Sequence, residues 1–151
     1  MAVFIARDER MRDSFAALMK DVNESLDVLG KTTVPAATGL QQKLTVASVG
    51  GNPPTRGVDD IPPELLALGE EVTTFAKLAA DLACDMMLQA DLLAQKVNIS
   101  DSQGRHLTHN RVELKYIDAT MSNLRLKVQI EHDSRVTFGL MFARAKPHLP
   151  T

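Results

Sequence analysis

Tryptophan is absent from this chain of 151 residues, tyrosine occurs once and phenylalanine five times. So few aromatic residues argue against long packed β-sheets, which favour aromatic and β-branched side chains. The single cysteine, Cys84, excludes a disulfide scaffold within the chain. No apolar run approaches the ~18 residues of a membrane-spanning helix. We therefore expect a protein without a transmembrane segment, either soluble or bound at the edge of a membrane.

An excess of positive charge is also missing, since the net charge is −2. A nearly balanced charge gives no electrostatic reason to expect a nucleic-acid partner. The glycines Gly50, Gly51 and Gly57 match neither the phosphate-loop pattern nor the dinucleotide-binding fingerprint. The composition therefore predicts no nucleic acid and no cofactor.

What the chain does have is an apolar ladder with alternating spacings of three and four residues. This spacing is typical of a helix that buries one narrow seam against another helix. The ladder comprises Leu65, Leu68, Val72, Phe75, Ala79, Leu82, Met86 and Leu93, with Gln89 as its polar interruption. A second ladder comprises Leu114, Ile117, Met121, Leu124 and Val128. The turn signal Asp101-Ser102-Gln103-Gly104 lies between them. Together they predict an antiparallel helical hairpin, coiled-coil-like, with helices over 63–98 and 107–131.

An amphipathic stretch near the start predicts a further helix over 8–30. Its apolar stripe is Phe15, Leu18, Met19, Val22, Leu26 and Leu29. Asp8 or Asp13 can cap its first turn, and Gly30 offers the left-handed residue that often ends helices. The fold class we expect is therefore all-α, in a single domain over 1–151.

The composition changes between residues 31 and 62, where prolines and glycines are frequent. We expect a long extended arm here, with a short strand over 43–49 as one option, because loops of this length are usually functional or disordered. Pro35 favours extended geometry at Val34. The arm has too few apolar residues to form a core, so we expect it to contact another chain or the outer face of the hairpin. The candidate partner-binding residues are Thr32, Thr33, Val34, Pro35, Leu44 and Val46.

The last segment, 132–151, permits two interpretations. Apolar residues alternate at Leu124, Leu126, Val128 and Ile130, and again at Val136, Phe138, Leu140 and Phe142. Such alternation is typical of a β-hairpin. The helical period from 114 to 128 is longer and matches the central ladder, so we favour helix. The alternative is an α+β fold with a C-terminal β-hairpin over about 124–143.

Few residues suggest chemistry. His106 and His109 have the spacing of two metal ligands on one helical face, but no cluster completes the set, so we expect solvated side chains for them. Cys84 is interpreted as a small buried core residue rather than a nucleophile. Asp81, Asp85 and Asp91 are expected on a solvated acidic face. No catalytic, cofactor-binding or metal-binding residue is therefore predicted, and we expect a protein that is not an enzyme.

The segment from Phe15 to Pro35 resembles the opening of a mitochondrial intermembrane-space family of coiled-coil-domain proteins linked to the regulation of protein import. Thr32-Thr33-Val34-Pro35 matches the end of that family's Asn-Thr-Thr-Val-Pro motif, with Lys31 in place of Asn. Cys84 falls where the family has a helical cysteine, and Leu114-Lys115-Tyr116 resembles its Leu-Lys-Trp. The stretch from Asp133-Ser134-Arg135 to Pro147 resembles the family's terminal region. The family carries several cysteines, whereas this chain has one.

The resemblance implies an all-helical fold and a mitochondrial address. We therefore expect a non-enzymatic accessory subunit of an inner-membrane complex, such as one of the respiratory chain, on the intermembrane-space side. Its expected partners are other protein subunits of a large assembly. The alternative is a free soluble intermembrane-space factor that regulates protein import.

Overall fold

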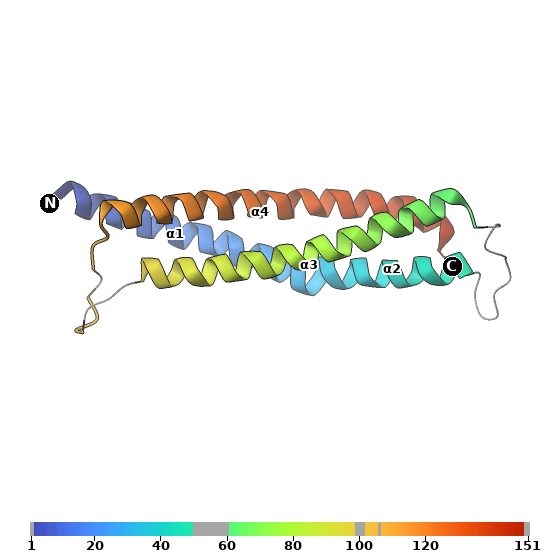
Figure 1. The fold of residues 1–151 in the computed structure, drawn as a ribbon, viewed down its shortest axis with the longest axis horizontal. Coiled ribbons are helices and arrows are strands. Elements are labelled where there is room, and N and C mark those ends of the chain that lie inside the picture. Colours follow the sequence, from blue (N-terminus) through green and yellow to red (C-terminus); the bar gives the residue numbers. More distant parts are fainter. Residues whose placement is uncertain (1, 50–60, 99–101, 106, 150–151) are drawn as a thin grey trace. The chain divides into compact units, whose positions relative to one another are not determined.

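The computed structural model describes residues 2–49, 61–98, 102–105 and 107–149, and side chains within these ranges except those of 2–7 and 48–49. Its elements are α1 (Ala2–Val28), the π-helical turn η1 (Leu29–Thr33), α2 (Val34–Val49), α3 (Pro63–Val97), α4 (Arg111–Ala145) and a short 3-10 turn η3 (Lys146–His148) (Figure 1). The described part of the chain contains no strand. The all-α prediction is confirmed, and the C-terminal β-hairpin is wrong.

The first helical stretch continues past Gly30, where we expected it to end. Val34 has helical dihedral angles and donates its backbone N–H to the carbonyl of Leu29, a bond across five residues. Pro35 has no N–H to donate, and in a regular α-helix its ring meets the carbonyl four residues earlier. A π turn widens the backbone at this point and lets the chain pass the proline without leaving the helix. Gly30 does not have the positive φ that a helix-ending glycine needs.

The extended arm is therefore wrong over 31–49, and so is the short strand over 43–49. These residues form η1 and α2. Leu40 and Leu44 are buried in one apolar cluster with Leu65, Leu68 and Val72 of α3. This packing stabilises a helix that its one proline and one glycine disfavour, because most helical stability in proteins comes from tertiary contacts. The rest of the expected arm, 50–60, lies outside the described residues.

The chain divides into two compact units. Unit 1 comprises Met1–Leu26 and Ala83–Ile130, and unit 2 comprises Asp27–Leu82 and Glu131–Thr151. Both α3 and α4 contribute residues to both units. The single domain over 1–151 remains a prediction.

Unit 1 consists of α1 up to Leu26, the second part of α3 and the first part of α4. Its buried apolar residues come from all three helices: Met11, Leu18, Val22, Met86, Ala90, Leu93, Val97, Leu114, Ile117, Met121, Leu124 and Val128. Cross-helix contacts join Lys96 to Tyr116 and Gln89 to Asn123. The contact with the higher residue number on α3, Lys96, is made to the lower residue number on α4, Tyr116. The two helices therefore run antiparallel in this unit. Between them, Gly104 has φ +80° in the predicted turn.

Unit 2 consists of η1, α2, the first part of α3 and the last part of α4. Its core cluster contains Leu40, Leu44, Leu65, Leu68, Val72 and Ala145, with Phe138, Met141 and Leu149 packed against it at partial exposure. Phe75 stacks on Phe138 at 5.7 Å between ring centroids. The residues that suggested a β-hairpin lie on a helix here, where Phe138 turns inward and Val136 and Leu140 remain exposed.

Both predicted ladders are confirmed as buried seams. Phe75, Leu82 and Gln89 are partly buried, and every other ladder residue of the two helices is buried. The second helix is longer than predicted, since α4 runs from Arg111 to Ala145 and not from 107 to 131. The first predicted helix begins earlier than residue 8, at Ala2. Asp8 therefore lies inside α1 and does not cap it.

Candidate functional site

The six predicted partner-binding residues do not form one exposed surface. Thr33 is buried, and Leu44 belongs to the core cluster of unit 2. Thr32 and Pro35 are exposed, Val34 is half-buried, and Val46 is 54% exposed on α2. Only the exposed positions can contact a partner without unfolding of unit 2.

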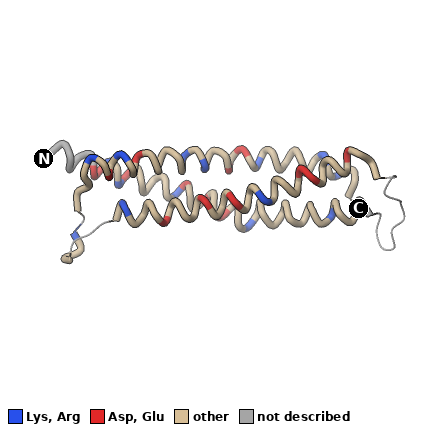
Figure 2. Tube along the Cα trace, in the orientation of Figure 1, with Lys and Arg blue, Asp and Glu red and all other residues tan. Residues whose placement is uncertain are grey.

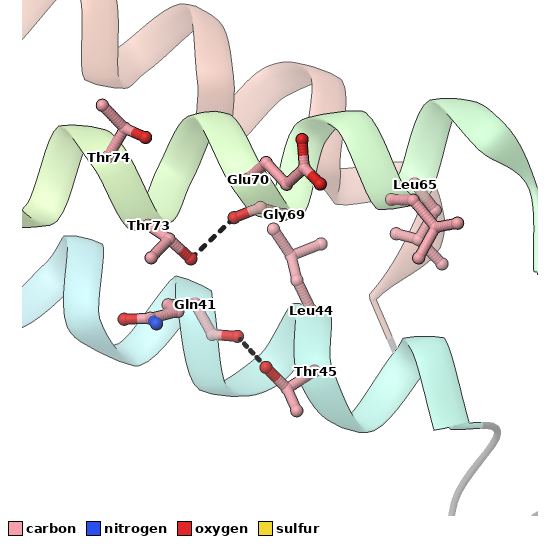
Figure 3. A pocket seen from close by; sticks show the side chains of 9 residues that line it. Gln41, Leu44, Thr45, Leu65, Gly69, Glu70, Thr73 and Thr74 are labelled. Atoms are coloured by element: carbon pink, nitrogen blue, oxygen red, sulfur yellow. Dashed lines mark hydrogen bonds between the residues drawn. The ribbon is translucent and has the colours of Figure 1, made fainter.

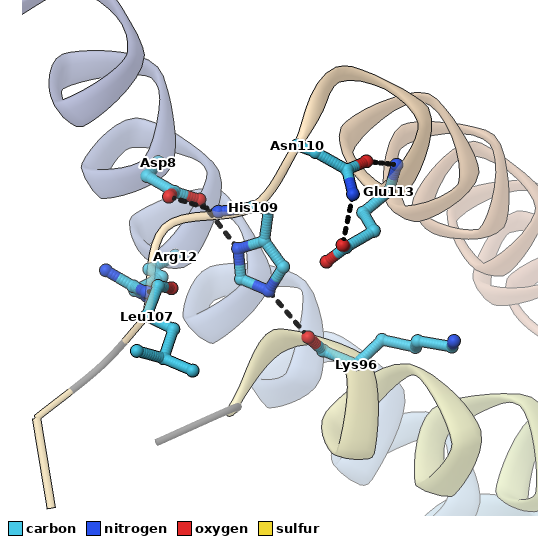
Figure 4. A network of polar contacts seen from close by, with 7 residues as sticks. All are labelled: Asp8, Arg12, Lys96, Leu107, His109, Asn110 and Glu113. Atoms are coloured by element: carbon cyan, nitrogen blue, oxygen red, sulfur yellow. Dashed lines mark hydrogen bonds and ion pairs between the residues drawn. The ribbon is translucent and has the colours of Figure 1, made fainter. Parts of the chain in front are cut away.

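A buried polar network lies in unit 1, where no sequence pattern predicted it. The carboxyl group of Asp8 on α1 accepts a hydrogen bond from the backbone N–H of His109 and forms a second one with ring Nδ1 of His109, both at 2.8 Å. The other ring nitrogen, Nε2, lies 2.6 Å from the carbonyl oxygen of Lys96 near the end of α3. The side chains of Asp8 and His109 are 2% and 1% exposed. Figure 4 shows the imidazole between the Asp8 carboxyl group and the Lys96 carbonyl.

The hydrogen-bond partners determine how many protons this network holds. A carbonyl oxygen only accepts, so Nε2 of His109 donates to Lys96. Nδ1 then faces a carboxylate oxygen of Asp8, and this contact needs a proton between the two atoms. The pair is therefore either imidazolium with carboxylate or neutral imidazole with carboxylic acid. In both forms it is neutral as a whole, as burial requires.

His109 joins three elements at the same end of unit 1. It accounts for one orphan carbonyl at the end of α3, and it directly precedes Asn110, which caps α4 by accepting the backbone N–H of Glu113 at 2.9 Å. A guanidinium N–H of Arg12 donates to the carbonyl oxygen of Leu107 at 2.7 Å (Figure 4). The expected solvated role of His109 is wrong. Its function in this geometry is to tie α1 to the α3–α4 connection.

The other candidates for chemistry do not assemble. Cys84 is exposed, so its interpretation as a buried core residue is wrong. His132 is half-exposed and lies 4.0 Å from the carboxylate of Glu131, and His106 lies outside the described residues. Among the residues that the structure describes, no three His, Cys, Asp or Glu side chains gather as a metal site.

Two grooves lie in unit 2. The first lies between α2 and α3 and is lined by Gln41, Leu44, Thr45, Leu65, Leu66, Gly69, Glu70, Thr73 and Thr74. Figure 3 shows the hydroxyls of Thr45 and Thr73 turned back onto the carbonyls of Gln41 and Gly69, at 3.0 and 2.8 Å. The second lies between α3 and α4, with Phe75, Leu78 and Met141 as apolar lining and Glu70 and Glu71 as acidic residues beside them. Both suit an apolar side chain better than a polar ligand.

Unit 1 has a groove of its own between α3 and α4. It is lined by Gln89, Leu92, Tyr116, Ala119, Thr120 and Asn123. Leu92 and Tyr116 are among the large apolar side chains that remain exposed. All of these lining residues are uncharged, so an apolar partner would not have to desolvate a charged lining side chain there.

Ion pairs flank the seams. In unit 1, Lys127 of α4 contacts Asp85 of α3, and its hydrogen bond lowers the pKa of the Asp85 carboxyl. In unit 2, Arg144 of α4 donates to Glu71 of α3 at 2.7 Å, which raises the pKa of the guanidinium. Figure 2 shows both signs of charge distributed along α1, α3 and α4, whereas Lys43 is the one charged residue of α2.

Comparison with known proteins places this chain in no family. No protein-family model, no curated protein sequence and no solved structure matches it. None of the helices within the described ranges combines the length and the apolar character needed to cross a bilayer.

Proposed function

We propose that this protein is a non-enzymatic helical subunit with a structural role in a larger protein assembly. The observation that carries the proposal is the set of large apolar side chains left exposed on α3 and α4. In unit 2 these are Leu66, Leu78, Val136, Leu140 and Phe142, and in unit 1 they are Met87, Leu88, Leu92, Val112, Tyr116, Leu126 and Ile130. Where such side chains form a contiguous patch, the patch is typical of a protein interaction site.

The finer architecture of the proposal is a coiled-coil-like helical hairpin. One face of each long helix is used for the seam inside the protein, and the opposite faces are available to partners. Thr32, Pro35 and Val46 extend the available surface of unit 2, since their side chains are exposed. Thr33 and Leu44 support this surface from within.

For the cellular setting we propose the intermembrane-space side of a mitochondrial inner-membrane complex, such as one of the respiratory chain. The support is the resemblance of Phe15–Pro35 to the import-linked coiled-coil family described above. A member with the one cysteine Cys84 lacks the disulfide pairs of that family. Such a chain would be retained by contacts with neighbouring subunits and not by disulfides of its own.

Native electrophoresis of the tagged protein from its own cells, followed by mass spectrometry of what co-migrates, tests the proposal. We expect migration with a large complex. A double substitution, Val136→Glu with Leu140→Glu, should release the protein from the complex because it places charge on exposed apolar positions. Migration of the wild-type chain as a small species would overturn the subunit proposal in favour of a free factor.

The matched control is Lys77→Glu, which changes charge at an exposed polar position of α3. It should leave the complex intact. The melting temperatures of both variants should equal that of the wild type, because exposed positions contribute little to folding stability. Release by both variants alike would argue against a specific apolar interface.

A further inference from the structure

The first part of α4 carries a second apolar ladder on the face opposite its buried seam. The seam residues of unit 1 run from Leu114 to Val128 and are buried. The ladder residues are Val112, Tyr116, Ala119, Asn123, Leu126 and Ile130, and all six are exposed. Val112 is 77% exposed and Leu126 59% exposed. Solvated helix faces normally carry charge. The six ladder positions between 112 and 130 carry none, although Lys115 and Lys127 flank them and the ammonium of Lys96 lies 5.8 Å from the centroid of the Tyr116 ring.

The spacing of this ladder identifies the kind of partner it fits. Its steps are four, three, four, three and four residues, the same period as the seam. A strict seven-residue repeat on one face is the pattern of a helix that packs along a second helix in knobs-into-holes fashion. A globular partner places no such demand on the spacing.

Side-chain sizes match when the second helix is α4 of another copy running antiparallel. In this register a twofold axis passes near the position of Met121 along the helix. Val112 of one copy then lies opposite Ile130 of the other, and Tyr116 lies opposite Leu126. Ala119 then lies opposite Asn123 at the centre, where a small residue leaves room for the amide. Every layer occurs twice by symmetry, as a self-complementary interface requires.

Charge order supports the same pairing. Glu113 and Lys127 are two heptads apart and therefore lie on the same flank of the ladder. This flank faces α3, because Lys127 contacts Asp85 of α3. In the antiparallel register Glu113 of one copy faces Lys127 of the other, twice per dimer. Glu113 already accepts from Asn110 and Lys127 already contacts Asp85, but a carboxylate and an ammonium each bind several partners. A parallel copy does not bring these opposite charges together.

We infer that this protein forms an antiparallel homodimer through the outer face of α4 in unit 1. Leu92 of α3 lines the groove beside Tyr116 and Ala119 and lies on the α3-facing flank, so it adds apolar surface near the dyad. The inference does not depend on the proposed role in a larger assembly, because it concerns the isolated chain.

Sedimentation equilibrium of the purified full-length chain tests the inference directly. We expect twice the monomer mass at micromolar concentrations. Leu126→Glu should weaken dimerisation about 100-fold or more, because it buries two charges per dimer in apolar layers. The control Asn23→Glu adds the same charge at an exposed position of α1 and should leave the dimer intact. A monomer mass for the wild-type chain at every concentration would overturn the inference and point to a different helix as the partner of this face.

Charge reversal tests the orientation. Glu113→Lys or Lys127→Glu alone should weaken the dimer about tenfold, since each places like charges together twice. The double variant should recover most of the wild-type affinity, because the pairs are restored with opposite signs. Melting curves report any separate loss from the Asp85 contact. A double variant weaker than either single variant, with unchanged folding, would exclude the antiparallel register.

A thiol crosslink locates the dyad independently. Ser122 faces Ser122 of the second copy in this register, whereas Lys115 faces Gln129. In a Cys84→Ala background, Ser122→Cys should give a covalent dimer with a short bis-maleimide reagent, and Lys115→Cys should not. The Cys84 replacement is needed because that thiol is exposed. Equal crosslinking at both positions would contradict the proposed dyad.

Discussion

The two units bury ionisable side chains in different ways. In unit 1, Asp8 and His109 are 101 positions apart in the chain and both are almost fully buried. In unit 2, the buried carboxylate of Glu131 receives two hydrogen bonds from Arg135, one turn further along the same helix, at 2.7 and 2.6 Å. The Arg135 side chain is 45% exposed. One pair therefore forms only when the tertiary structure does, and the other is available as soon as α4 is helical.

This difference indicates which contacts specify the fold. A local pair stabilises one helix and says little about its neighbours. A long-range buried pair determines which segments pack together, because each partner left alone is a buried, unsatisfied group. We expect unit 1 to respond sharply to changes in its pair, whereas unit 2 depends more on its apolar core.

Replacing His109 should have the largest effect. His109→Ala leaves the Asp8 carboxylate buried without its partner and the Lys96 carbonyl without its donor, so we expect a loss of about 3–5 kcal/mol in unfolding free energy. Hydrogen exchange should increase first in α1, residues 8–26. His132→Ala, at a half-exposed position, is the control and should change the free energy by about 0.5 kcal/mol or less. An unchanged melting curve for His109→Ala would refute the buried anchor.

Truncation in the apolar core of unit 2 should follow closely. Leu68 is fully buried in the cluster with Leu40 and Leu44. Leu68→Ala should cost about 2–5 kcal/mol, since it removes apolar contact and leaves a cavity. Chemical denaturation measures the change, with the exposed Leu78→Ala on the same helix as the control. A similar small loss for both variants would mean that α2 does not pack on α3 in solution.

The two seams were predictable because burial on a helix repeats every three to four residues. Leu93 on α3 and Ile117 on α4 follow that repeat and are fully buried. Leu82 shows the limit of the pattern, since it lies on the ladder but is only partly buried. The period of the apolar residues predicts which face of a helix is buried, but it does not predict how far each side chain on that face is buried.

The helix over 34–49 was not predictable from local signals. Gly30 and Pro35 are typical of a helix end, and local sequence contains no mark of a π turn. The burial of Leu40 and Leu44 against α3 outweighs these propensities, and such tertiary contacts are not visible in the sequence order. The Asp8–His109 pair was not predicted for the same reason. Its two residues are 101 positions apart, and no periodic sequence pattern relates residues at that distance.

A smaller effect is expected from the local pair of unit 2. Glu131→Gln keeps the shape of the side chain but removes its charge and leaves only one oxygen to accept from Arg135, because the amide NH2 cannot accept a hydrogen bond. We expect a loss of about 1–3 kcal/mol, less than for His109→Ala. Urea denaturation of both variants under the same conditions makes the comparison. A larger loss for Glu131→Gln than for His109→Ala would reverse the contrast between the two units.

The smallest effect concerns acid pH and the exposed pair of unit 1. Lys127 lowers the pKa of Asp85 through its hydrogen bond, so the folded protein keeps this carboxylate ionised at lower pH than the unfolded chain does. The resulting stabilisation is present above the unfolded value of about 3.9 and disappears as the pH falls through the folded value. The Asp85 side chain is 45% exposed, so solvent screening keeps the contribution small.

Melting temperatures between pH 7 and pH 2 should show Asp85→Asn slightly less stable than the wild type near neutrality, with the difference vanishing in acid. Asp81→Asn, at an exposed position of the same helix, should follow the wild type throughout. A gap between Asp85→Asn and the wild type that persists at the lowest pH would show that the substitution acts through packing and not through this ion pair.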